Sequence, residues 1–280
     1  MADLSPENRL NHLSAKEWLK FTKSWFIHNP PPRKKDEILH PAKYPEDMIA
    51  GFIQFFTKEG AVVCDPFLGT GSTLVACHQT KRNGIGIELQ EKYARIAQKR
   101  VKELEGQLTL GAAGAALDCK QVVLQGNSAA LEQLWKNYSL PAIDLVITSP
   151  PYGPMLKNKG LVTKQREEKG LDLKYSDDEH DLGNAHSYAD FLQRLVDIFI
   201  QIKPRVKDGG YVVVILQNYM EKSGFKMLAW DFAREMTKYY EFRGERIWAQ
   251  DNKTLYPYGY RYSFVLNVHH HYCLIFRKNI

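Results

Sequence analysis

The chain has 280 residues and a formal net charge of +6, from 38 Lys and Arg against 32 Asp and Glu. Hydrophobic residues make up 44% and charged residues 25%, a globular balance that excludes disorder throughout the chain. No apolar run approaches the ~20 residues of a membrane helix, and the first residues lack the pattern of a secretory signal. We therefore expect a protein without membrane association, whose mild basic excess permits a polyanionic partner.

The four cysteines, Cys64, Cys77, Cys119 and Cys273, have no CxxC spacing and are too few for a disulfide framework. This usage favours a reducing cytoplasm, with the cysteines as small core residues.

The first forty residues differ from the rest of the chain. Apolar spacing predicts a short helix over 15–25, and the three prolines that follow exclude helix and favour an extended conformation. Three basic residues come next, Arg33, Lys34 and Lys35, so the segment is either a linker or a basic arm that lies on an acidic partner. We expect residues 1–40 to form a helical and Pro-rich basic arm and residues 41–280 a single domain.

From residue 44 onward helical and strand patterns alternate. The predicted helices are 46–56, 74–80, 91–108, 129–138, 188–203 and 226–239, and the predicted strands are 61–65, 83–88, 121–125, 143–148, 211–217, 245–249 and 272–276. This alternation predicts an α/β fold, Rossmann-like and doubly wound, with a mostly parallel seven-stranded sheet and helices on both faces.

A glycine turn follows the first strand of this domain. Asp65 ends the strand, and Gly69 and Gly71 lead into the next helix. The third glycine of a dinucleotide fingerprint is absent, because Leu74 stands there, and no Lys follows Gly71 as in a P-loop. The turn therefore suits a ligand other than a pyrophosphate, and the carboxylate of Asp65 favours a cationic one. A purely structural turn between strand and helix would also need two glycines.

The next two strands end in polar residues at the same predicted sheet edge. Glu88 lies roughly 20 residues beyond the glycine turn, where an acid can bind the two hydroxyls of a ribose. Asn127 could hydrogen-bond an adenine edge, but Asn127 or Ser128 could equally cap the following helix.

The fourth strand ends in the sequence Thr148-Ser149-Pro150-Pro151-Tyr152. An exocyclic amino group of a base is a poor nucleophile, because its lone pair is delocalised into the ring. The Ser149 hydroxyl and the Pro150 carbonyl could accept its two hydrogens and free that lone pair, and Tyr152 could stack on an extruded base. The prolines alone would also be explained by the end of a strand.

Together, DPFLGTGST and TSPPY resemble the motifs of the amino-methylating DNA methyltransferases, which use S-adenosylmethionine to methylate N4 of cytosine or N6 of adenine. The resemblance extends from His40 to the C-terminus and implies the class I fold of S-adenosylmethionine-dependent methyltransferases. It implies a cofactor site formed by Asp65, Pro66, Phe67, Gly69, Gly71, Ser72, Thr73, Glu88, Asn127, Ser128, His40 and Pro45, and a catalytic site formed by Ser149, Pro150, Pro151 and Tyr152. Tyr44 stands where many relatives carry lysine, and the cofactor motif precedes the catalytic motif, the reverse of the order in many relatives.

The leading serine of the catalytic motif favours N4 of cytosine over N6 of adenine, by analogy with this family. Methylation of cytosine C5 is excluded, because that reaction needs a nucleophilic cysteine that usually follows proline, and none of the four does. Two alternatives stay open: methylation of a base amino group in RNA, and a nucleic-acid-binding protein that keeps the fold without catalysis.

Residues 153–186 form a segment longer than a strand-to-helix connection needs. We expect this segment to be a DNA-facing loop and, with residues 252–262, to supply most of the sequence specificity. The expected DNA-binding residues are Arg33, Lys34, Lys35, Lys157, Lys159, Lys164, Arg166 and Lys169. The acidic second half of the loop, which includes Asp181, could fold back on the protein.

The expected partner is double-stranded DNA in the cytoplasm of a prokaryotic cell, for a protein that is either bacterial or phage-encoded. A cognate restriction endonuclease and a homodimer remain open. We expect no metal at His269, His270 and His271, because adjacent side chains of a strand face opposite ways.

Overall fold

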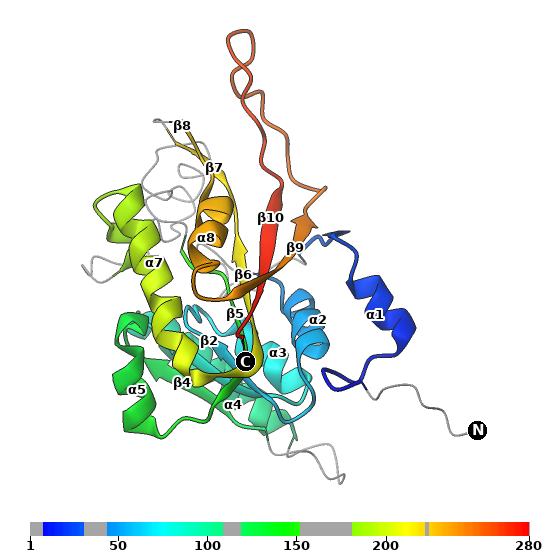
Figure 1. Cartoon of the computed structure of the whole chain (residues 1–280), viewed down its shortest axis with the longest axis vertical. Helices are drawn as coiled ribbons and strands as arrows, with labels where there is room; N and C mark the ends of the chain where they lie inside the picture. Colours follow the sequence, from blue (N-terminus) through cyan, green and yellow to red (C-terminus); the bar gives the residue numbers. More distant parts are fainter. Residues whose placement is uncertain (1–7, 31–43, 109–118, 152–180, 222–223, 280) are drawn as a thin grey trace.

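A computed structural model describes residues 8–30, 44–108, 119–151, 181–221 and 224–279. Its centre is an eight-stranded sheet in the order β1-β9-β10-β6-β5-β2-β3-β4, with a separate hairpin formed by β7 and β8 (Figure 1). The strands are β1 Trp25–Ile27, β2 Val62–Asp65, β3 Asn83–Glu88, β4 Gln121–Gln125, β5 Ile143–Thr148, β6 Val206–Leu216, β7 Tyr219–Glu221, β8 Gly224–Lys226, β9 Glu241–Ala249 and β10 His270–Arg277.

The sheet is parallel except at one strand. β4, β3, β2, β5 and β6 pair in parallel, β10 is antiparallel to both β6 and β9, and β1 pairs in parallel with β9. The predicted fold class, a mostly parallel and doubly wound sheet, is therefore confirmed.

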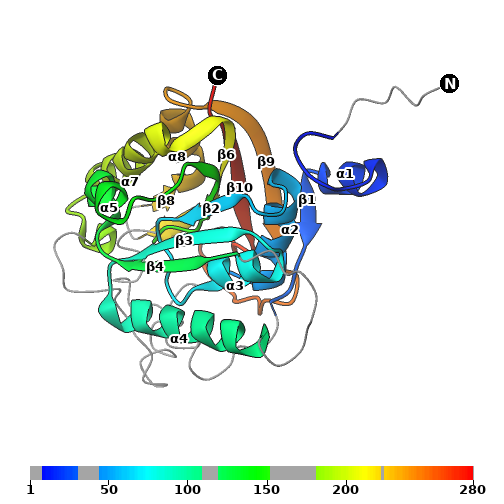
Figure 2. The same ribbon diagram turned by 90° about the horizontal axis from the view of Figure 1, so that it is seen from below.

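Helices cover both faces of the sheet (Figure 2). They are α1 Ala15–Phe21, α2 Glu46–Phe56, α3 Ser72–Gln79, α4 Glu91–Leu108, α5 Leu131–Tyr138, α7 Tyr188–Ile202 and α8 Leu228–Met236, with short 3-10 turns at Ser128–Ala130, Leu182–Asn184 and Lys203–Arg205. Two core clusters separate by the two-residue period of the strands. Along β6, Val212 and Val214 pack with α5, α7 and α8, whereas Val213 and Ile215 pack with α2 and α3.

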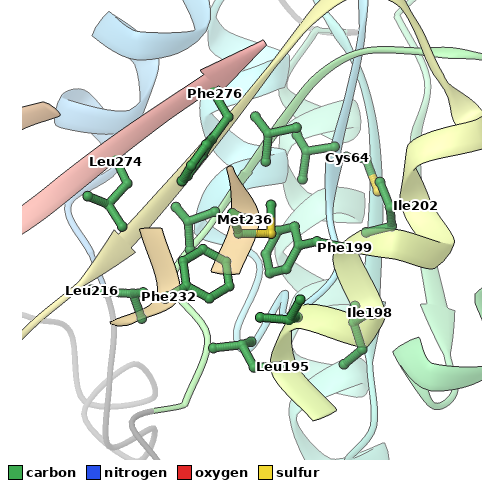
Figure 3. Packing of buried hydrophobic residues seen from close by; sticks show 14 of the residues in the cluster. Cys64, Leu195, Ile198, Phe199, Ile202, Leu216, Phe232, Met236, Leu274 and Phe276 are labelled. Carbon is green, nitrogen blue, oxygen red and sulfur yellow. The ribbon is translucent and has the colours of Figure 1, made fainter. Parts of the chain in front are cut away.

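The larger of the two core clusters fixes α7 beside the carboxyl edge of the sheet. Ser187 caps α7, and its side chain accepts a hydrogen bond from the Asp190 amide at 3.1 Å. Apolar residues at helical spacing, among them Leu195, Ile198, Phe199 and Ile202, then point into the cluster around Phe232 and Phe276 (Figure 3). No helix in the described part of the chain is long and apolar enough to cross a membrane.

The N-terminal segment contributes an eighth strand that the sequence pattern did not predict. The expected helix over 15–25 ends at Phe21, and β1 follows after a short turn. The Arg246 guanidinium explains this path, because it lies 4.0 Å from the Phe21 ring centroid and 4.5 Å from that of Phe26. The contact joins residues far apart in the sequence, so local periodicity carries no sign of it.

Residues 8–30 also pack on the core through α2. The rings of Phe21 and Phe55 stack with centroids 4.1 Å apart, and the Asn11 side chain donates to the Phe55 carbonyl at 2.6 Å. This part of the expected arm therefore lies against the domain, while Arg33, Lys34 and Lys35 fall outside the described residues.

Candidate active site

Four parallel strands end side by side at one edge of the sheet. β2, β3, β4 and β5 end at Asp65, Glu88, Gln125 and Thr148. A pocket of about 240 Å³ opens at this edge and is lined by Pro66, Phe67, Ile87, Glu88, Leu89, Gln90, Asn127, Ser128, Ala129, Ser149, Pro151, Asp181, Leu182, Arg194, Asp197, Ile198 and Gln201. Residues of both the predicted cofactor turn and the predicted catalytic motif line this pocket. Ligand sites in α/β proteins commonly lie at this edge of the sheet, outside the carboxyl ends of the strands.

Asp65 is fully buried and does not itself line this pocket. Its carboxylate accepts hydrogen bonds from the Tyr44 hydroxyl at 2.6 Å, the Thr148 hydroxyl at 2.6 Å and the Phe67 amide at 3.0 Å, and from the Thr73 hydroxyl. Burial raises the pKa of Asp65, and these hydrogen bonds oppose the rise. Asp65 therefore connects the predicted cofactor turn with the end of β5 through hydrogen bonds, without lining the pocket itself.

Tyr44 takes part in this network from outside the turn. It is buried, and the pKa of its hydroxyl is raised well above its ordinary value, chiefly by burial and then by the charge of Asp65. The neutral hydroxyl of Tyr44 thus donates a hydrogen bond to the buried carboxylate.

The glycine turn needs left-handed backbone at two positions. Gly69 has φ +56° and Gly71 has φ +91°, a region that side-chain-bearing residues rarely adopt. A Cβ at Gly71 would also come within 3.0 Å of the Ala97 Cβ on α4. These two constraints explain why both positions are glycine and place the turn tightly against α4.

Glu88 holds the turn from the neighbouring strand. Its carboxylate accepts from the Gly69 amide at 2.8 Å and from the Gln90 amide at 2.8 Å. Burial raises the pKa of Glu88 to about 7; the two amide hydrogen bonds oppose the rise, while the nearby charges of Asp65 and Asp181 add to it. Glu88 is thus a pocket carboxylate that titrates near neutral pH.

The predicted catalytic motif begins where β5 ends. Ser149 and Pro151 line the pocket, and Pro150 between them is buried. Thr148, the last residue of β5, is held by Asp65, so the position of Ser149 depends on the same carboxylate as the cofactor turn. Tyr152 lies outside the described residues.

Two more of the expected cofactor residues, Asn127 and Ser128, line the pocket. The Asn127 side chain accepts a hydrogen bond from the Ala129 amide at 2.8 Å, and the Ser128 hydroxyl donates to the Pro66 carbonyl. Both proposed uses of Asn127, as a cap and as a pocket residue, are therefore geometrically compatible.

Gly69 and Gly71 lie in the turn and Ser72 and Thr73 begin α3; none of the four lines the pocket, and Pro45 is the N-cap of α2. Outside the described residues are His40 and the expected DNA-binding residues Arg33, Lys34, Lys35, Lys157, Lys159, Lys164, Arg166 and Lys169.

Two hydroxyl groups at the junction of the glycine turn and α3 are buried without a hydrogen-bond partner among the described residues. They belong to Thr70 and Ser72, which are 2% and 4% exposed. Buried hydroxyls are usually hydrogen-bonded, so these two are unsatisfied polar groups next to the predicted cofactor turn.

The sequence analysis did not predict the pocket wall formed by α7. Arg194, Asp197, Ile198 and Gln201 follow helical spacing and share one face of α7. The available signal was the helical spacing of Arg194, Asp197 and Gln201 on a helix whose other face is apolar. Asp181, from the acidic end of the long predicted loop, also lines the pocket, buried beside the Glu88 side of the site.

A family model described as DNA methylase matches residues 5–99 and 143–279, most of the chain. The protein therefore belongs to the N6/N4 DNA methylase family, which confirms the family predicted from DPFLGTGST and TSPPY.

Individual relatives match over shorter stretches. The type II methyltransferase M.BglI of Bacillus subtilis is 37% identical over 92 residues, which are 33% of this chain and 26% of the relative. The type II methyltransferase M2.DpnII of Streptococcus pneumoniae is 40% identical over 63 residues, or 22% of this chain and 24% of the relative. The alignments span 18% to 33% of the first curated relatives.

Among solved structures, a methyltransferase from Pyrococcus furiosus aligns with 86% of this chain and 87% of its own, at a TM-score of 0.47 and 15% identity.

Proposed function

We propose that this protein transfers a methyl group from S-adenosylmethionine to the exocyclic amino nitrogen of a base in DNA, with N4 of cytosine as the preferred target. The observation that carries the proposal is the single pocket wall shared by Pro66, Phe67 and Glu88 on the cofactor side and Ser149 and Pro151 on the catalytic side. Family membership supports the DNA substrate.

The residues of the pocket fit such a cofactor. Glu88 offers carboxylate oxygens to the hydroxyls of a ribose, and Phe67, Leu89, Leu182 and Ile198 give apolar walls for a flat ring. Acidic side chains outnumber cationic ones along the lining, and Arg194 is paired with Asp190 at 2.8 Å. This charge balance suits a cationic ligand.

The chemistry requires little acid–base catalysis from the protein. Bound S-adenosylmethionine supplies an electrophilic methyl carbon on a positively charged sulfur. The Ser149 hydroxyl and the Pro150 carbonyl would accept the two amino hydrogens of the target base and so localise the nitrogen lone pair for attack. Tyr152 would stack on the extruded base, and the proton that the nitrogen loses after transfer would leave through one of these acceptors.

One assay with two substrates tests the activity. Tritium-labelled S-adenosylmethionine is incubated with unmethylated plasmid DNA or with structured RNA, and the modified nucleosides are separated by chromatography. We expect label in DNA as N4-methylcytosine. Label as N6-methyladenine would contradict the base assignment, label in RNA alone would contradict the DNA assignment, and no transfer would support the non-catalytic alternative.

Two substitutions test the catalytic motif. Ser149→Ala should lower kcat roughly 10- to 100-fold, the loss of one hydrogen bond to a charge-developing group, while Ser24→Ala, at an exposed serine, should leave kcat unchanged. Tyr152→Ala should weaken base stacking, worth ~1–3 kcal/mol, with cofactor affinity nearly intact. Collapse of cofactor affinity in Tyr152→Ala would place Tyr152 in the cofactor site instead.

The basic loop residues belong to the same proposal. Replacing Lys157, Lys159, Lys164, Arg166 and Lys169 with alanine should weaken DNA binding and flatten its dependence on salt, because each phosphate contact releases counterions. The matched control removes five exposed lysines from α1, α4 and α5: Lys16, Lys20, Lys99, Lys102 and Lys136. Equal salt slopes in the two variants would move recognition away from this loop.

A further inference from the structure

The connection between β9 and β10, residues 250–269, carries many exposed aromatic side chains. We call this segment the aromatic finger. Tyr260 is 68% exposed, Tyr262 93% and Phe264 88%. Figure 1 shows the finger as a two-armed extension that projects beyond the ends of β9 and β10. A group of large side chains that the fold leaves in water marks an interaction surface.

Strand register places this finger at the active-site edge of the sheet. Thr148 and Val214 pair where β5 and β6 run in parallel, so both strands end at the edge where Ser149 begins. β10 is antiparallel to β6, with Tyr272 opposite Leu216, and His270 lies opposite Ala249 at the end of β9. The finger therefore leaves the sheet from the same edge as the catalytic motif.

Hydrogen bonds within the aromatic finger hold its backbone in a defined conformation. The Asn267 side chain bridges its two arms, because it accepts from the Tyr256 amide at 3.0 Å and donates to the Tyr256 carbonyl at 2.9 Å. At the tip, Gly259 has φ +69°, and its carbonyl accepts from the amides of Tyr262 and Ser263, both at 2.9 Å. These bonds order the backbone while the rings of Tyr262 and Phe264 stay outside.

The charge and the aromatic content of the finger indicate the chemical class of its partner. The finger has the cations Lys253 and Arg261, four tyrosines and one phenylalanine, and its one carboxylate, Asp251, lies at its base and accepts from the Asn29 side chain at 2.7 Å. The Arg261 guanidinium lies 5.4 Å from the Tyr260 ring centroid at the tip. Exposed rings beside a cation, with no carboxylate from 252 to 269, match a polyanion with stacked bases better than a second protein surface.

We propose that the aromatic finger contacts duplex DNA beside the target base, with Tyr260, Tyr262 and Phe264 against base edges or between base steps. The inference rests on the proposed function, because it takes DNA as the substrate. It assigns the finger to positioning the duplex, while Ser149 to Tyr152 carry the chemistry.

A double variant with Tyr262→Ala and Phe264→Ala tests this proposal in the full-length protein. Both side chains are almost fully exposed, so the melting temperature should stay at the wild-type value. Tyr138→Ala is the matched control, since Tyr138 is 57% exposed at the C-terminal end of α5, the helix that returns from β4 to the start of β5 at the opposite edge.

Affinity for a fluorescein-labelled pool of 40-base-pair random duplexes is measured by anisotropy, and cofactor affinity by calorimetry. We expect the double variant to bind DNA roughly tenfold or more weakly, with a raised KM for DNA and unchanged cofactor affinity. The Tyr138→Ala control should bind like wild type.

Two results would overturn the inference. One is a double variant with wild-type DNA affinity and wild-type KM for DNA. The other is a double variant that changes oligomeric state on size-exclusion chromatography while its DNA affinity holds, because the finger would then bind a second copy. Absence of methyl transfer to DNA by the wild-type protein would instead count against the proposed function, so the two failures are distinguishable.

Discussion

The two halves of the sheet differ in the side chains that they carry at the edge where the active site is proposed. On the β2–β3–β4–β5 side, polar groups are buried and interlocked: Asp65 accepts four hydrogen bonds, and Glu88 accepts two backbone amides. On the β6–β10–β9 side, the same edge of the sheet carries exposed rings such as Tyr262 and Phe264. One half fixes a pocket, and the other half presents a surface.

The difference follows from the size of each proposed ligand. A small cofactor can be enclosed, so the groups that bind it must be oriented by the protein before it arrives. A DNA duplex cannot be enclosed, and its contacts form on side chains that the folded protein leaves in water. Substitutions on the enclosed side should therefore affect folding and binding together, and those on the exposed side should affect binding alone.

Asp65→Ala should have the largest effect, because it leaves three buried hydroxyls and one amide without their acceptor. We expect a loss of roughly 3–5 kcal/mol in the free energy of unfolding and loss of cofactor binding, measured by urea denaturation and calorimetry. Asp65→Asn keeps the volume but turns one acceptor oxygen into an NH2 group that faces the same donors. Asp65→Asn should therefore lose both stability and cofactor affinity, and a variant that keeps wild-type cofactor affinity would contradict the positioning role of Asp65.

Gly86→Ala should disturb the enclosed half from inside the sheet. A Cβ at Gly86 would lie 2.5 Å from both Cδ atoms of the buried Leu68, next to Gly69 in the cofactor turn. Such overpacking costs about 1–3 kcal/mol in the free energy of unfolding, and cofactor affinity should fall with it. Gly51→Ala on α2, where nothing lies within 4 Å, is the control and should stabilise by ~0.5–1 kcal/mol. Equal effects at both glycines would contradict the tight packing of the turn.

Cofactor affinity should depend on pH through Glu88. Its pKa of about 7 lies above the ordinary 4.5, so the folded protein without cofactor holds this proton more tightly than the unfolded chain. The resulting stabilisation is present below pH 4.5 and is lost as the pH rises through about 7.

Ribose hydroxyls donate to the ionised carboxylate, so cofactor binding should release a proton. Affinity should then rise with pH up to about 7, by as much as roughly tenfold per pH unit, and level off above it. Calorimetry in buffers of different ionisation enthalpy measures the proton release. Glu88→Gln should show a flat profile, and a wild-type profile that is equally flat would remove Glu88 from ribose binding.

Two tyrosines give the smallest effects and the most direct contrast. Tyr240 is buried and donates to the Phe199 carbonyl at 2.9 Å, so Tyr240→Phe should lower the free energy of unfolding by about 1 kcal/mol. Tyr260→Phe, on the aromatic finger, should change it by less than about 0.5 kcal/mol. Thermal denaturation of both variants would test this, and a large loss in Tyr260→Phe would mean that the finger is folded against the protein.

The sequence by itself predicted the parallel sheet and the position of the predicted cofactor and catalytic residues at one edge of that sheet. Short apolar runs that alternate with helical periodicity indicate buried parallel strands. Because such strands all end at the same edge, the sequence predicts that Asp65, Glu88 and Ser149 lie near one another. These inferences depend on local order along the chain, which sequence patterns record.

Only the tertiary structure decided where each of these residues lies relative to the pocket and which elements surround it. It placed Asp65 behind the pocket as a shared acceptor, closed the pocket with α7, and added β1 to the sheet through the contact of Arg246 with Phe21 and Phe26. It also carried the aromatic finger to the active-site edge through the pairing of β10 with β6. Each of these depends on contacts between residues distant in the chain, and hydrophobic periodicity, which reports a residue's own face, contains no information about its partner.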